Sequence, residues 1–243
     1  MRKFLSPVEV QHLVDLASGA KGDVVIDAQG GSEDGSKEFQ GTNAAEDAAR
    51  PSAGGWIHRE QDMIVDTIFC CLSDLLNIDK RLMMNQVVED YVSPTHERIV
   101  EAMQLLRYGP GEEYPARHDF TYPSIENRYQ PKRYATIIMY LTGEGDVVEN
   151  GVVRRSSRSS GKHANNNVIA EDGLRGGETT FPRAITTDFH HGVKVEPQSG
   201  KAILFYNFLP DGNADDLSQH SGGMVEKGVK YVSNVWVWDP IVN

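Results

Sequence analysis

The chain has 243 residues, of which 24 are Lys or Arg and 35 are Asp or Glu, so its formal net charge at pH 7 is −11. That length suits one large domain or two small ones. The acidic balance excludes nucleic acid or an anionic membrane as the main partner, since both require a positively charged surface. No apolar run approaches the roughly 18 residues that a membrane-spanning helix needs, so no membrane segment is expected.

The first residues do not form a secretory signal, because Ser6, Glu9 and Gln11 interrupt any apolar stretch after the basic start. The two cysteines, Cys70 and Cys71, are adjacent and cannot bridge each other without strain. The absence of a disulfide framework favours a reducing compartment. For the sequence as written we expect a cytoplasmic protein, unless an upstream anchor has been removed; the sequence does not identify the compartment further.

Two helices are expected before residue 100. Ser6 and Glu9 form a capping box ahead of an apolar face, which predicts a helix over residues 7–17. Residues 27–55 are rich in Gly, Ser, Asp and Glu and indicate a mobile loop. Apolar residues at helical spacing predict a second helix over 59–76. Residues 1–100 are therefore expected to form a helical support region.

From residue 102 onward, five short segments are rich in β-branched and aromatic residues and are separated by turn residues, which favours an antiparallel sandwich or barrel; they are residues 103–109, 133–142, 192–197, 201–209 and 230–238. The basic, Ser-rich stretch 143–175 indicates a surface insertion, with a loop that binds an acidic partner as the alternative. We expect one mostly β domain with flanking helices over residues 1–243, with its β core at 101–243.

Near the C-terminus, His220 lies in a polar turn and Lys230 follows inside a strand pattern. Lys230 shares a strand face with Val232 and Trp236 and is expected to point into the barrel. A buried ammonium needs a carboxylate partner, which is either a structural ion pair or a bound ligand. Upstream, His118 stands beside Asp119, so these two residues and His220 are candidates for a 2-His-1-carboxylate site that holds Fe(II) and leaves positions open.

The chain resembles the prolyl 4-hydroxylase family of Fe(II)- and 2-oxoglutarate-dependent dioxygenases. The resemblance runs nearly end to end and rests on an ordered series of motifs: Tyr-x-x-Gly-x-x-Tyr at 108–114, Arg-x-Ala-Thr-x-x-x-Tyr-Leu at 133–141, GGETTFP at 176–182, and HxG, GxK and NxW between 220 and 236. It implies a double-stranded β-helix, or jelly roll, with N-terminal helices packed against it.

The resemblance also implies roles for individual residues. His220 resembles the distal iron ligand, Lys230 the residue that pairs with the far carboxylate of 2-oxoglutarate, and Tyr108 a hydrogen-bond donor to that carboxylate. Asp119 resembles the iron-binding carboxylate. Thr136 and Thr179 are expected to line the pocket.

The sequence departs from the family at the first ligand. The family places His-x-Asp so that the His is three residues after the second tyrosine, and here that position holds Arg117. A guanidinium has no acceptor and stays protonated, so it cannot bind iron. Either a β-bulge near Pro115 and Ala116 turns His118 inward, which completes the metal set His118, Asp119 and His220, or the site has lost a ligand.

The resemblance implies a hydroxylase acting on a peptidyl proline, with Fe(II), 2-oxoglutarate and ascorbate as cofactors, succinate and CO2 as co-products, and a proline-containing peptide as partner. The alternative is a catalytically silent jelly-roll module that binds peptide and lost a metal ligand at Arg117. A jelly-roll metal protein of another reaction type is a third reading, but it has no need of a buried cation at Lys230.

Overall fold

The computed structural model describes residues 3–19, 53–85, 98–120, 132–155, 172–185 and 192–239. Within these ranges the helices and strands follow in this order: α1 (Pro7–Ala17), β1 (Ala53–Ile57), the 3-10 turn Arg59–Gln61, α3 (Met63–Leu76), β2 (Met103–Tyr108), β3 (Tyr114–Arg117), β4 (Lys132–Tyr140), β5 (Val147–Glu149), β6 (Val152–Arg154), β7 (Arg175–Gly176), β8 (Thr179–Phe181), β9 (Val193–Val195), β10 (Ala202–Tyr206), the 3-10 turn Asp216–Ser218, β11 (His220–Gly222), β12 (Val225–Lys227) and β13 (Lys230–Asp239).

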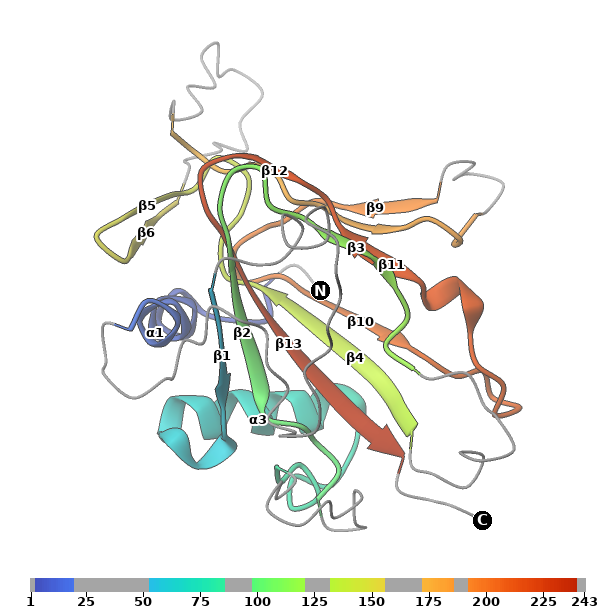
Figure 1. Ribbon diagram of the computed structural model, residues 1–243. Coiled ribbons are helices and arrows are strands. Elements are labelled where there is room, and N and C mark those ends of the chain that lie inside the picture. Colours follow the sequence, from blue (N-terminus) through green and yellow to red (C-terminus); the bar gives the residue numbers. More distant parts are fainter. Residues whose placement is uncertain are drawn as a thin grey trace, which may run out of the picture.

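Two antiparallel sheets form the body of the molecule (Figure 1). The larger sheet has the order β1-β2-β13-β4-β10, and the smaller has the order β3-β11-β8-β9. Apolar residues from both sheets pack together between them, among them Tyr140 of β4 and Val195 of β9. The hydroxyl of Tyr140 donates to Thr179 Oγ1 of β8 across this layer at 2.6 Å. The mostly β architecture with flanking helices expected from the sequence is confirmed.

The other face of the larger sheet is covered by α1 and α3 (Figure 1). Residues of both helices and of strands β2, β4 and β13 form one buried cluster. Along β13, Tyr231, Val235 and Val237 enter this cluster. Val232 instead packs in the layer between the two sheets, so the strand alternates as expected and the larger sheet separates a structural core from the interior of the roll.

Helix α1 has the bounds and the cap that the sequence predicts. Glu9 N–H donates to Ser6 Oγ at 3.3 Å, and Ser6 N–H donates to Glu9 Oε2 at 2.7 Å, which completes the capping box. The apolar face, with Val10, Leu13 and Val14, is buried.

The second helix begins later than the sequence indicated, at Met63 instead of residue 59. Asp62 causes the difference, because its side chain accepts from the backbone N–H groups of Ile64 and Val65 and so caps the first turn. The other carboxylate oxygen of Asp62 lies 2.7 Å from His12 Nε2, which links the start of α3 to the middle of α1.

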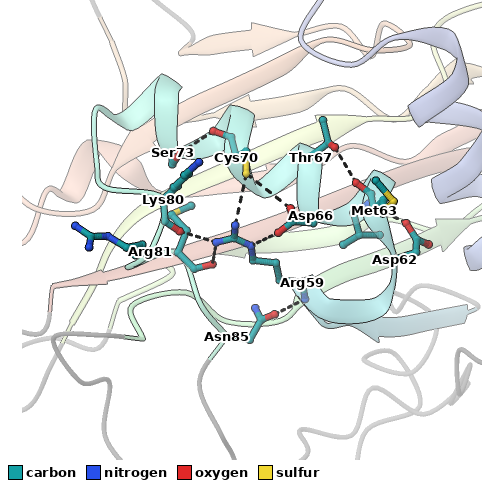
Figure 2. Close-up of polar contacts among 12 residues, drawn as sticks. Arg59, Asp62, Met63, Asp66, Thr67, Cys70, Ser73, Lys80, Arg81 and Asn85 are labelled. Atoms are coloured by element: carbon teal, nitrogen blue, oxygen red, sulfur yellow. Dashed lines mark hydrogen bonds and ion pairs between the residues drawn. The ribbon is translucent and has the colours of Figure 1, made fainter.

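Residues 59–61 form a 3-10 turn that places the buried Arg59 against the segment after α3 (Figure 2). The guanidinium donates to Asp66 Oδ1 at 2.6 Å and to the carbonyl oxygens of Lys80 and Met83 at 2.6 and 3.1 Å. Asn85 accepts from the Arg59 backbone N–H. This network holds the helical layer together at a distance from the interior of the roll.

Two loop predictions need correction. The last residues of the expected loop 27–55 belong to β1, where Ala53, Gly54 and Gly55 pair with β2; residues 20–52 lie outside the described part of the chain. The expected surface insertion 143–175 begins with the hairpin β5–β6, which binds α1 because Gln11 bonds the backbone of Gly151 and Val153. The insertion also ends inside the fold, at the fully buried Leu174; residues 156–171 are not described.

Candidate active site

A pocket opens inside the roll between β2, β13 and the smaller sheet. It encloses about 370 Å³ of empty space, part of it open to solvent. Its lining includes Tyr108, Arg117, His220 and Lys230, which the sequence had singled out, together with Thr179 and Asn234. Lys230 and Tyr108 are register partners on adjacent strands, and His220 is the register partner of Arg117. Lys230 and His220 therefore face the same cavity.

Lys230 is 4% exposed, and burial lowers its pKa to about 8, an effect that the charge of Glu178 partly offsets. Its ammonium nitrogen lies 5.3 Å from the centre of the Tyr108 ring. Within the described residues, no hydrogen-bond or ion-pair partner reaches this ammonium. Tyr108 is also buried, and burial raises the pKa of its hydroxyl.

Two glycines leave space for Lys230. A Cβ at Gly177 would lie 2.9 Å from Lys230 Cδ, and the φ of +72° at Gly177 favours glycine as well. A Cβ at Gly222 would lie 3.6 Å from Lys230 Nζ and 3.4 Å from Tyr114 Cβ. The motifs around residues 177 and 222 thus keep side chains away from the lysine stem and the ammonium.

Asp119 lies behind His220, which lines the pocket, with 3.7 Å between Asp119 Oδ2 and His220 Nε2. Both are buried. Asp119 Oδ2 accepts from Thr136 Oγ1 at 2.8 Å and from Trp236 Nε1 at 3.0 Å. His220 Nδ1 lies 3.0 Å from the carbonyl oxygen of Ser218, which can only accept, so Nδ1 carries the proton and the lone pair of Nε2 faces Asp119.

Burial and neighbouring charges set the protonation of this pair. Burial raises the pKa of Asp119, but the charges of His220 and Arg117 and the bonds from Trp236 and Thr136 outweigh it, so its pKa lies below the usual range. Burial lowers the pKa of His220 despite the opposing effect of Asp119. His220 is therefore neutral at pH 7, and Arg117 is the cation that stabilises ionised Asp119 at that pH.

Arg117 lies on the same face as Asp119, as strand alternation predicts. Its Nε is 3.3 Å from Asp119 Oδ1, and its guanidinium carbon lies 3.6 Å from the centre of the Tyr114 ring. Nη1 is buried and has no hydrogen-bond partner in the described part of the chain. A cation thus lies beside the two groups best suited to bind a metal.

His118 does not join Asp119 and His220. Its Nε2 lies 3.2 Å from Asp216 Oδ1 and 3.3 Å from the Asp216 carbonyl oxygen, and its ring packs on Phe120. The register shift between β3 and β11 puts one extra residue on β3 between Tyr114 and Arg117, so a bulge lies at Pro115 and Ala116 as the sequence suggested. The expectation that this bulge turns His118 inward is wrong, because His118 contacts Asp216 instead. Among the described residues, no three His, Cys, Asp or Glu side chains are grouped to hold a metal.

Sequence reasoning missed the groups that hold Asp119. From the sequence, Trp236 was assigned no role beyond the strand face that it shares with Lys230, and Thr136 was expected only to line the pocket, yet both donate to the carboxylate. Asn207, fully buried, donates in turn to Thr136 Oγ1 at 3.0 Å. The available signal was the shared strand face of Trp236 and Lys230, which already placed the indole in the interior of the roll.

Comparisons with known proteins agree with this architecture. The sequence model of the 2OG-Fe(II) oxygenase superfamily matches residues 103–238. Prolyl 4-hydroxylase 5 of Arabidopsis thaliana is 27% identical over 247 residues, which cover 96% of this chain and 65% of the relative. The transmembrane prolyl 4-hydroxylase of Homo sapiens is 30% identical over 169 residues, 60% of this chain and 31% of that protein. The chain thus spans about 65% of the length of the curated Arabidopsis relative.

Solved structures show the same fold. The viral collagen prolyl hydroxylase of Paramecium bursaria Chlorella virus-1, in its 2OG complex, aligns with a TM-score of 0.58 at 20% identity, over 98% of this chain and 93% of that one. A Trichoplax adhaerens prolyl hydroxylase, in complex with a hypoxia-inducible-factor peptide fragment, aligns with a TM-score of 0.55 at 16% identity, over 98% and 82% of the two chains. The fold is the jelly roll of the prolyl hydroxylases, and the chain belongs to the 2OG-Fe(II) oxygenase superfamily, in which the relatives it matches are prolyl 4-hydroxylases.

Proposed function

We propose that the pocket binds 2-oxoglutarate and that Lys230 takes its far carboxylate. The observation that carries this proposal is a buried ammonium that faces an open pocket, with no hydrogen-bond or ion-pair partner among the described residues. An isolated buried charge is unfavourable, and a bound carboxylate supplies the missing counter-charge. Tyr108, beside Lys230 on β2, is placed to bond the same carboxylate.

Iron fits this site poorly. Asp119 and His220 are two ligand-type groups 3.7 Å apart, but the third family position holds Arg117, whose positive charge is directed at Asp119. A cation next to the carboxylate opposes a divalent metal ion, and a guanidinium offers it no lone pair. The best-supported function is therefore a jelly-roll module that binds a 2-oxoglutarate-type dicarboxylate without iron chemistry.

An extended, proline-containing peptide is the proposed macromolecular ligand. The relatives are prolyl 4-hydroxylases, and the Trichoplax structure contains a bound peptide. The helices and the roll share one continuous buried cluster, which supports the proposal that residues 1–243 act as a single domain. No helix in the described ranges has the length and apolarity needed to cross a bilayer.

A second candidate is a 2-oxoglutarate-dependent hydroxylase of peptidyl proline, with Fe(II) and ascorbate as cofactors and succinate and CO2 as co-products. The polar surroundings of Asp119 and His220 favour it, since the donors Thr136 and Trp236 and the Ser218 carbonyl orient both groups as outer partners orient metal ligands. In that case Asp119 and His220 are the catalytic residues and the metal ligands.

Two measurements on the full chain test the proposal. Calorimetry measures 2-oxoglutarate binding, and a succinate assay with Fe(II), ascorbate, 2-oxoglutarate and a collagen-like Pro-Pro-Gly peptide measures turnover. The silent module binds 2-oxoglutarate but forms no more succinate than the variant Lys230→Met. Succinate formation by the unmodified chain, dependent on both iron and Lys230, would instead establish the hydroxylase.

A further inference from the structure

We infer that Arg117 replaces the metal ion in this pocket, so that Arg117 and Lys230 together bind a short dicarboxylate in the absence of metal. The inference rests on the proposed function and assigns the second half of the same ligand. In the family resemblance the near end of 2-oxoglutarate belongs to iron; here a guanidinium lies at that end.

The Arg117 guanidinium has N–H donors that its contact with Asp119 does not use. Nε is directed at Asp119 Oδ1 at 3.3 Å, while Nη1 is buried without a partner among the described residues. Arg117 also lines the pocket. Because the planar guanidinium carries five N–H groups in a fork that matches a carboxylate, the remaining donors are suited to a two-point contact with one.

The charges in the pocket require an anion. Arg117 and Lys230 contribute two positive charges, and Asp119 contributes one negative charge that Arg117 already shares. Glu178 also acts on Lys230, but it lies 3.6 Å from the ammonium of Lys194. A ligand with two carboxylates matches two cations that line the same pocket.

The site is also held in shape before a ligand binds. The Tyr114 ring lies under the guanidinium, and Asp119 fixes Nε, so the plane of the fork is set by two contacts. Gly222 keeps the space between Tyr114 and Lys230 free of a side chain. A preorganised site loses less conformational entropy when the ligand binds.

A pocket that holds the carboxylate through Arg117 should select ligands differently from a pocket that holds it through iron. A metal ion chelates the keto oxygen and the neighbouring carboxylate of 2-oxoglutarate, so it needs the keto group. Arg117 needs only the carboxylate. Glutarate, which is 2-oxoglutarate without the keto oxygen, should therefore bind this chain about as tightly as 2-oxoglutarate.

The test is calorimetry on the full chain, treated with EDTA, against 2-oxoglutarate and glutarate. We expect both to bind with affinities within about threefold of each other, and Mn(II) in place of EDTA to tighten neither by more than about threefold. Arg117→Gln should weaken both ligands at least about tenfold. Arg154→Gln, which removes an exposed guanidinium paired with Glu149 outside the pocket, is the matched control and should change neither affinity.

Binding that appears only with Mn(II), a strong preference for 2-oxoglutarate over glutarate, or unchanged affinity in a folded Arg117→Gln variant would each overturn the inference while leaving the proposed co-substrate pocket in place. Failure of both ligands to bind, with or without metal, would overturn the proposed function as well. The metal and glutarate arms use the unmodified chain, so they decide the question even if Arg117→Gln fails to fold.

Discussion

The two ends of the pocket differ in how they compare with the pattern that the family resemblance implies. At the Lys230 end, the ammonium and Tyr108 line the pocket, and the glycines at 177 and 222 leave room beside the lysine. At the Asp119 end, the resemblance implies a neutral imidazole where this chain has the positively charged Arg117, which lies 3.3 Å from Asp119.

Hydrogen bonds hold both Asp119 and His220 in place. Thr136 and Trp236 donate to the carboxylate, and the Ser218 carbonyl orients His220. The comparison shows that a site can carry a cation beside a carboxylate and still hold that carboxylate with neutral donors, because a buried carboxylate without donors is unfavourable.

The largest expected effect comes from removing the charge at the Lys230 end. Lys230→Met should weaken 2-oxoglutarate binding by at least about 100-fold, which corresponds to about 2.7 kcal/mol. It should also stabilise the fold, because a pKa lowered from 10.5 to about 8 corresponds to up to about 3 kcal/mol of unfavourable burial, present in full below pH 8 and lost as the pH rises towards 10.5. Calorimetry and urea unfolding at pH 7 measure the two effects.

Lys227→Met is the control for that change, since Lys227 is partly exposed and lies 3.8 Å from Asp172. It should alter neither quantity strongly. If Lys230→Met binds 2-oxoglutarate as tightly as the unmodified chain, Lys230 does not bind its carboxylate.

Placing an imidazole at the Asp119 end gives the second prediction. Arg117→His should raise the affinity for Fe(II) or Mn(II) at least about tenfold, because it supplies a third ligand and removes the opposing cation. Anaerobic metal titration measures this, with Arg154→His as the control. An affinity equal to that of the unmodified chain would mean that position 117 does not limit metal binding.

The pH dependence of dicarboxylate binding tests whether the charged form of Lys230 is required. In EDTA, dicarboxylate affinity should be constant below about pH 7.5 and fall above pH 8, approaching tenfold per pH unit, because the free pocket then holds a neutral lysine. Neighbouring groups do not produce this fall: Arg117 stays charged, and burial raises the pKa of Tyr108 further from this range. An affinity that stays flat to pH 9.5, in a chain that circular dichroism shows to be folded, contradicts the assignment.

Substitutions of the two tryptophans on β13 test how much the indole hydrogen bond to Asp119 contributes to stability. Trp236→Phe removes a donor to the fully buried Asp119 and should lower the free energy of unfolding by about 1–3 kcal/mol. Trp238→Phe removes the bond to the more accessible Glu101 and should cost less. Urea unfolding of both variants measures the difference, and equal losses would show that Trp236 only packs.

The smallest effect is expected far from the pocket. Asp62→Ala removes the cap of α3 and the contact with His12, and should cost about 1 kcal/mol of stability without changing dicarboxylate affinity. Asp62→Asn keeps a capping oxygen and should retain most of the stability. A loss of ligand binding in either variant would show that the helical layer controls the pocket.

Patterns among residues close in sequence predicted the helix cap and the strand alternation, because both are set locally. The Ser6–Glu9 capping box located α1, and strand alternation correctly placed Arg117 with Asp119 and His118 on the opposite face. Contacts between distant segments were not predictable in this way. The bond from Trp236 to Asp119 joins residues 117 positions apart, and the binding of the β5–β6 hairpin by Gln11 depends on how α1 packs.

The glycines around Lys230 have a consequence for chemical probes of this protein. A Cβ added at Gly177 would lie 2.9 Å from the lysine stem, and one added at Gly222 would lie 3.6 Å from the ammonium, so the space around Lys230 leaves little room for larger groups. An inhibitor built on a dicarboxylic acid skeleton has to leave that terminus unsubstituted. Bulky groups, fluorophores or linkers belong at the opposite terminus of the scaffold.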